Sequence, residues 1–298
     1  MNVGGRPRYN IDDYREDVQR LYETGESYDS IIQGDAALMK DAIVLVNKFV
    51  PTKAKRAVEL KNCRAGPDEE LMQLVDVANV ACGYHAGDPS TMMKTIRLAK
   101  QHGVRVGAHP GLPDLLGFGR RQMAISPEDM YSMVIYQVGA LGAMLAAEGM
   151  QLNHVKPHGE LYFYVQRDAE ILDAVLRAVR VFRVPIYGPW TRAMTQACER
   201  VGVPLIPELY VDIDYDADGR LVPVAKSAPA TPDSIRRRVL DFAAKDEVTC
   251  SAGSVVNLGF ASKSFSICIH SDLSGALNNA TAARDAVEQI KKAEEARE

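Results

Sequence analysis

Histidines in this sequence gather where the predicted strands end. Five of the six lie at or next to the carboxyl end of a strand: His85, His109, His154, His158 and His270. Imidazole transfers protons near neutral pH and also binds divalent metals. Because the carboxyl ends of parallel strands meet at one face of an α/β fold, these loops should converge. The pattern therefore predicts a reactive site at that face.

Basic and glycine residues surround the histidines. Lys156 follows a predicted strand and could stabilise negative charge that develops during a reaction. Arg120 and Arg121 could hold a substrate carboxylate through paired hydrogen bonds, and we expect one of the two to be structural. The nearby glycines would allow the backbone to approach a ligand closely.

Other chemistries have weaker signals. Three of the histidines with an aspartate would suit zinc or manganese, so a divalent metal is possible. Neither H-E-x-x-H nor H-x-H occurs, so the sequence assigns no metal ligands. Cys82 beside His85 could be a nucleophile or simply a small buried residue. The sequence has no G-x-S-x-G elbow and no P-loop, which argues against a serine hydrolase and a Walker-type ATP site in this chain.

The elements that carry these residues alternate between short apolar strands and amphipathic helices. Strands are expected at 57–60, 76–82, 104–108, 152–156, 184–187, 205–208 and 266–269. Helices are expected at 69–75, 89–102, 127–148, 169–180, 192–201, 234–244 and 276–296. This alternation predicts an α/β fold, a parallel (β/α) barrel. The alternative is an open doubly wound sheet, although no G-x-G-x-x-G follows the first strand.

Residues 1–52 read as an N-terminal helical extension, and residues 53–298 as the barrel. The apolar spacing predicts three helices in the extension, the last over 37–50 and stopped by Pro51. Two short helices around a glycine would fit a helix-turn-helix, but residues 1–50 hold six basic and nine acidic residues, which opposes nucleic acid binding. We favour an appendage packed on the barrel or on a partner chain.

Composition limits the class of protein. The 298 residues include 35 basic and 39 acidic side chains, so there is no strongly basic field for nucleic acid. No uninterrupted run of about 18 apolar residues predicts a membrane span, and the N-terminus lacks a signal-peptide pattern. The five cysteines are scattered, without C-x-x-C, which argues against a disulfide framework. We therefore expect a cytoplasmic protein that binds neither membrane nor nucleic acid.

Several stretches resemble the LamB/YcsF family, whose members include the first component of bacterial 5-oxoprolinase. The strong matches are ANVACGYHAGDP (78–89), VGAHPGLPDLLGFGRR (106–121), YQVGAL (136–141) and HVKPHGELY (154–162). Weaker matches are YVDIDYDADGRLVP (210–223) and CIHSD (268–272). Together these stretches follow the family's order along most of the chain after the extension.

The resemblance implies a TIM-like barrel, seven-stranded or incomplete, of the kind shared with some sugar deacetylases. It also implies ring opening of a cyclic amide, 5-oxo-L-proline to L-glutamate, with ATP hydrolysis coupled through partner subunits. We assign catalysis to His85, His109, Lys156 and His158. We assign substrate binding to Asn79, Asp88, Arg120, Arg121, Asp212 and His270.

The resemblance is incomplete at the first strand. The family reads roughly D-L-N-C-D-L-G-E there, whereas this chain has Asn62-Cys63-Arg64, with arginine in place of an acid. The leading hypothesis is a hydrolase that opens a lactam by histidine acid–base catalysis, with lysine and arginine stabilising anionic groups. The alternatives are a different C–N hydrolase, with or without a metal, and a non-catalytic subunit of a complex.

Overall fold

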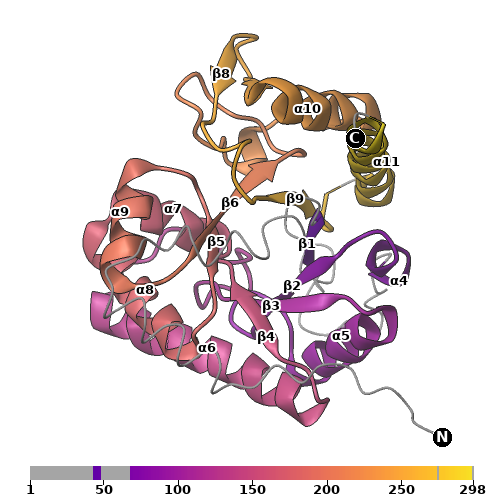
Figure 1. Ribbon diagram of the computed structural model, residues 1–298. Helices are drawn as coiled ribbons and strands as arrows, with labels where there is room; N and C mark the ends of the chain where they lie inside the picture. Colours follow the sequence, from indigo (N-terminus) through magenta and orange to yellow (C-terminus); the bar gives the residue numbers. More distant parts are fainter. Residues whose placement is uncertain (1–42, 48–67, 274, 297–298) are drawn as a thin grey trace, which may run out of the picture.

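Seven parallel strands form a closed barrel in the part of the chain that the computed structural model describes, residues 43–47, 68–273 and 275–296 (Figure 1). The strands are β1 (Ile43–Asn47), β2 (Val77–Ala81), β3 (Arg105–His109), β4 (Leu152–Val155), β5 (Ile186–Gly188), β6 (Leu205–Tyr210) and β9 (Ser266–His270). The ring closes because β9 pairs with both β6 and β1. The predicted barrel is confirmed, and the open sheet is excluded.

Helices surround the barrel (Figure 1). They are α4 (Asp68–Met72), α5 (Pro89–His102), α6 (Pro127–Ala147), α7 (Gly159–Arg167), α8 (Ala169–Phe182), α9 (Arg192–Val201), α10 (Pro232–Lys245) and α11 (Ala276–Glu295), with a short 3₁₀ turn, η1 (Val224–Lys226). A small antiparallel hairpin, β7 (Glu247–Thr249) and β8 (Val255–Asn257), lies outside the barrel. Helices α10 and α11 pack against each other, and α11 also contacts β9.

Local chemistry explains where these elements begin and end. The α5 helix starts at Pro89, whose missing N–H costs nothing there, and the Asp88 side chain accepts from the Ser90 and Thr91 amides. It ends at Gly103, which adopts the left-handed conformation that glycine tolerates. All five residues of β2 are buried, as expected for a parallel strand covered on both faces. The predicted bounds of α5 and α9 are confirmed.

The structure corrects the prediction of a third helix over 37–50, because Ile43–Asn47 is the first barrel strand. The Ile-Val-Leu-Val run is rich in β-branched residues, which favour a strand over a helix. The rest of the predicted extension, and the strand predicted at 57–60, lie outside the described residues. The short α7 helix was not predicted, because Gly159 directly after a strand suggested a loop.

Helix α6 is long and apolar enough, by length and composition, to cross a membrane. It is the one such helix in the described part of the chain. In the fold it packs against α8, β3 and β4. Its inward face carries Val134, Val138 and Leu141, which are fully buried. A covered helix of this kind is typical of a barrel's outer layer.

Leu141→Ala should destabilise the protein by about 2–5 kcal/mol, because it removes a fully buried side chain between α6 and the barrel. The matched control is Leu116→Ala, whose leucine is 80% exposed and should change stability by less than about 0.5 kcal/mol. Urea unfolding followed by circular dichroism measures both. Equal effects of the two substitutions would contradict this packing.

Candidate active site

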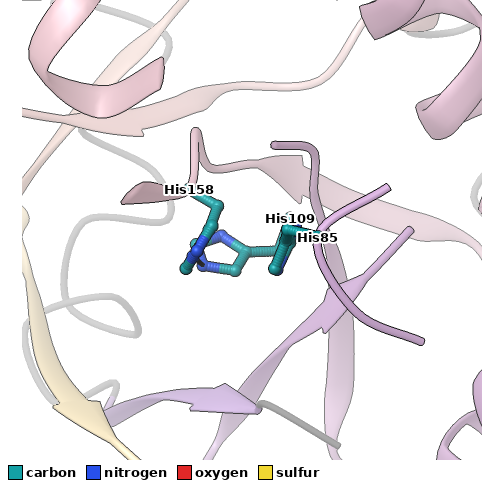
Figure 2. Close-up of side chains that lie close together, drawn as sticks. All are labelled: His85, His109 and His158. Atoms are coloured by element: carbon teal, nitrogen blue, oxygen red, sulfur yellow. Dashed lines mark hydrogen bonds between the residues drawn. The ribbon is translucent and has the colours of Figure 1, made fainter. Parts of the chain in front are cut away.

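Three buried histidines from three different βα units meet at the carboxyl ends of the strands (Figure 2). His85 lies in the loop after β2, His109 is the last residue of β3, and His158 precedes α7 after β4. The rings of His85 and His158 stack with centroids 3.7 Å apart, and the His109 ring meets His158 edge-on at 4.8 Å. The predicted convergence of these three residues is what the structure shows.

Backbone carbonyls orient two of the three rings. Nδ1 of His109 donates to the carbonyl oxygen of Lys156 over 2.7 Å, and Nε2 of His158 donates to that of Phe118, also over 2.7 Å. The donor role follows because a carbonyl oxygen can only accept. The remaining nitrogens, Nε2 of His109 and Nδ1 of His158, lie 3.0 Å apart. Each ring is therefore held at one nitrogen and faces its neighbour with the other.

The loop after β3 closes over this histidine cluster (His85, His109 and His158). A Cβ atom on Gly111 would lie 2.5 Å from Nδ1 of His85, so only glycine allows this approach. The Phe118 ring of this loop packs edge-on against His85 and His158, with ring centroids 5.4 and 5.0 Å apart. Phe118 itself adopts a positive φ of 59°, which turns its carbonyl toward His158.

Asp114 holds this loop in place. Its carboxylate accepts from the Gly117 amide at 2.8 Å and from Nε of Arg121 at 3.0 Å, and it also pairs with the Arg121 guanidinium. The hydrogen bonds from Arg121 hold the pKa of the Asp114 carboxyl below its usual range. The Arg121 guanidinium is thus engaged by Asp114 in this arrangement.

Lys156 turns into the barrel rather than toward the cluster. Its Nζ donates to Glu208 and to Sγ of Cys268, both at 2.9 Å, and lies 4.7 Å from the Tyr210 ring centroid. Glu208 also accepts from the hydroxyls of Tyr210 and Ser266. This buried network joins β6 and β9 to the residue that follows β4.

Ionisation in this network follows from burial and pairing. Burial alone would lower the pKa of the Lys156 ammonium, but the neighbouring Cys268 and Glu208 groups outweigh it and raise that pKa. Burial raises the pKa of the Cys268 thiol. We therefore treat Lys156 and Glu208 as a buried ammonium–carboxylate pair.

A histidine–aspartate pair lies at the end of β9. Asp212 accepts from both the backbone amide and Nδ1 of His270, at 2.6 and 2.8 Å. The arrangement directs the other ring nitrogen of His270 away from the carboxylate. Arg120 pairs with the adjacent Asp272 at 2.9 Å and lies 5.0 Å over the Phe118 ring. Arg120 thereby links the cluster's loop to the loop after β9.

Two predicted substrate-binding residues have local partners instead. The Asn79 side chain lies 2.5 Å from Nε2 of His154 inside the barrel. Burial and the charge of Lys156 hold the pKa of His154 well below its usual value, so this imidazole is neutral. Asp88 is an exposed helix cap that also accepts from the Thr91 hydroxyl. Neither Asn79 nor Asp88 makes one of the described contacts to the histidine cluster.

Cys82 is poorly suited to be a nucleophile. Its thiol is buried and donates to the carbonyl of Val80 at 3.2 Å. Burial raises its pKa to about 12, so the reactive thiolate is scarce at neutral pH. The structure thus supports the interpretation of Cys82 as a small buried residue at a strand end.

Sequence reasoning did not assign the groups that orient the site. The carbonyl of Phe118 and the side chains of Glu208 and Cys268 carry no role in the predicted set, although each contacts a predicted residue. Glu208 could have been found, because a carboxyl group on a strand with buried neighbours needs a cationic partner. No sequence signal identifies a carbonyl acceptor.

A metal could bind at the histidine cluster. One ligand nitrogen from each of His85, His109 and His158 lies within 4.8 Å of the other two. This is the one such group of histidine, cysteine or acidic side chains among the described residues.

Fold and site together define a TIM-like barrel with an imidazole-rich centre at the carboxyl ends of its strands. The LamB/YcsF family matches residues 57–296, and the chain belongs to this family. The chain is 43% identical over 231 residues to a lactam utilization protein LamB of Emericella nidulans, covering 78% of this chain and 91% of the relative. It is 42% identical over 222 residues to the 5-oxoprolinase A-type subunit of Bacillus subtilis, covering 72% and 83%.

A solved structure supports the same assignment. The crystal structure of the lactam utilization protein from Thermus thermophilus superposes with a TM-score of 0.73 at 37% identity. The match covers 85% of this chain and 98% of that one. The barrel described above is therefore the fold of the family.

Lys156→Met should destabilise the protein by about 3–5 kcal/mol, because it leaves the Glu208 carboxylate buried without its cation. The double variant Lys156→Met/Glu208→Gln should recover much of that loss, since it removes both charges. Urea unfolding of Lys156→Met, Glu208→Gln and the double variant measures the coupling free energy between the two side chains. Simple additivity of the two single changes would contradict a buried ion pair.

Asp114→Asn should destabilise the loop and cost about 1–3 kcal/mol at neutral pH, because it removes a charged acceptor. The folded pKa of Asp114 is lowered, so its contribution is present above the unfolded pKa and lost as pH falls through the folded value. The stability difference between wild type and Asp114→Asn should therefore shrink on acidification. Denaturation curves along a pH series test this, and a constant difference would refute it.

Proposed function

We propose that this protein hydrolyses the amide C–N bond of a lactam or related cyclic amide, of the 5-oxoproline type. The observation that carries the proposal is the buried cluster of His85, His109 and His158 at the carboxyl ends of the strands. The names of the relatives support the substrate class. The reaction adds water: its oxygen bonds to the carbonyl carbon, the C–N bond breaks, and the nitrogen takes a proton.

The surrounding residues suit defined tasks in this reaction. The histidine cluster would act at the lactam carbonyl. Arg120 is about one-third exposed and could exchange its Asp272 partner for a substrate carboxylate. His270, oriented by Asp212, is placed to carry a proton to or from a substrate group. These roles use residues at the carboxyl ends of four strands, β2, β3, β4 and β9.

Lys156 contributes by positioning, in this proposal. Its carbonyl holds the His109 ring and its ammonium is engaged by Glu208. An ammonium held in this way stabilises the strand ends on which the cluster is built. This role differs from direct oxyanion stabilisation, which would need the ammonium to face the substrate.

Partner subunits are part of the proposal. Relatives are named as one subunit of 5-oxoprolinase, so we propose that this chain works with further subunits and that any ATP is bound there. The alternative hypothesis is a subunit that does not catalyse, and it predicts no lactam turnover by the isolated chain.

His158→Gln should lower turnover of 5-oxoproline or a related lactam by at least about 100-fold, since it removes a group at the reactive centre. The assay follows amine release by the full-length chain, alone and with its co-purified partners, with and without ATP. His102→Gln is the matched control, because that imidazole lies at the end of α5 outside the cluster, and it should leave turnover unchanged.

Full activity of His158→Gln would refute the assigned site. Turnover by the isolated chain would exclude a purely non-catalytic subunit. Absence of lactam turnover by the wild type, both alone and with its partners, would refute the proposed reaction.

A further inference from the structure

The histidine cluster contains two nitrogens that face each other at short range. Nδ1 of His109 and Nε2 of His158 carry the protons that they donate to carbonyls. If both rings are neutral, the other nitrogens bear lone pairs 3.0 Å apart. Two lone pairs at that distance repel, so a positive group must be shared between these nitrogens. The candidates are a proton and a metal ion.

A third imidazole beside the pair favours the metal ion. A shared proton needs two nitrogens, whereas His85 brings a third ring against the pair, fully buried and stacked 3.7 Å from His158. Its ligand nitrogen lies within 4.8 Å of the other two. Three imidazoles that leave one position open are the ligand set of a catalytic zinc site. The cluster therefore has the composition of a metal site.

The hydrogen bonds at the far side of the rings also fit a metal. Metal-bound imidazoles almost always donate their second N–H to a carbonyl, carboxylate or water, which orients the ring and strengthens it as a ligand. His109 and His158 both show this arrangement, with Lys156 and Phe118 as acceptors. The acceptors belong to two separate segments, so each ring is oriented independently.

The distances require small movements only. Two nitrogens bound to one tetrahedral zinc ion lie about 3.3 Å apart, since each bond is about 2.0–2.1 Å long. The pair at 3.0 Å must open by a few tenths of an ångström. The His85 ring lies within 9° of parallel to His158, so it must turn about its side-chain bonds to point a nitrogen at the same ion.

We propose that His85, His109 and His158 together bind one divalent first-row transition-metal ion, with zinc the best match to three imidazoles. The inference rests on the proposed function only in placing the reaction at this cluster. A metal bound there would polarise the lactam carbonyl or activate water. Proton transfer would then be the task of His270, which lies on β9 and is oriented by Asp212.

Metal binding is tested directly on the full-length chain. The protein is stripped with a chelator, dialysed, and titrated with Zn²⁺ by calorimetry, and its metal content is then measured by elemental analysis. We expect about one ion per chain and a higher melting temperature with metal. Co²⁺ in place of Zn²⁺ should give the visible absorption of a tetrahedral site.

His109→Gln and His158→Gln should each weaken Zn²⁺ binding by at least about 100-fold, because loss of a ligand exceeds the 10- to 100-fold cost of losing an orienting partner. His102→Gln, which also removes one imidazole, should bind as the wild type does. Circular dichroism of each stripped variant checks that the fold is retained. A variant that fails this check is replaced by His85→Gln.

The outcomes separate this inference from the proposed reaction. Equal Zn²⁺ binding by wild type and folded cluster variants, or no binding by the wild type, overturns the metal site. Lactam turnover that persists in the stripped enzyme overturns the role of the metal in the reaction, while leaving the proposed reaction in place. Stoichiometric binding lost in the variants supports the metal site, even where no lactam is turned over.

Discussion

The site depends on the parallel pairing of β3 with β4 and its continuation past the strand ends. The Lys156 amide donates to the Ala108 carbonyl, and the His158 amide donates to that of Pro110, both at 2.8 Å. These two bonds set the spacing between His109 and His158, and the His109 side chain adds a third link by donating to the Lys156 carbonyl. A shift of register would place the two imidazoles out of reach, because side chains alternate between the faces of a strand.

Below the cluster the barrel interior is unusually polar. The Lys156–Glu208 pair, with Cys268 alongside, joins three strands whose outward faces are covered by helices. Such a pair adds little net stability over an apolar core, because both charges are desolvated, but its geometry is demanding. In this barrel it links β6 and β9 to the end of β4.

The long family motif over 106–121 has a physical basis in these contacts. It supplies one histidine of the cluster in His109, a close backbone approach at Gly111, a carboxylate that fixes the loop in Asp114, and the carbonyl of Phe118. Each of these features depends on the others, since the carbonyl reaches His158 only when the loop is held. Four contacts of the site thus depend on one short stretch of the chain.

The sequence by itself predicted most elements, the barrel class and a set of five strand-end histidines that includes the three that meet, because apolar periodicity and strand-end position are local signals. Only the tertiary structure decided that Lys156 faces Glu208, that Arg121 belongs to Asp114, and that residues 43–47 form a strand. Those outcomes depend on which side chains, far apart in the chain, share one buried volume, and burial, charge pairing and hydrogen-bond direction are properties of that volume rather than of any segment.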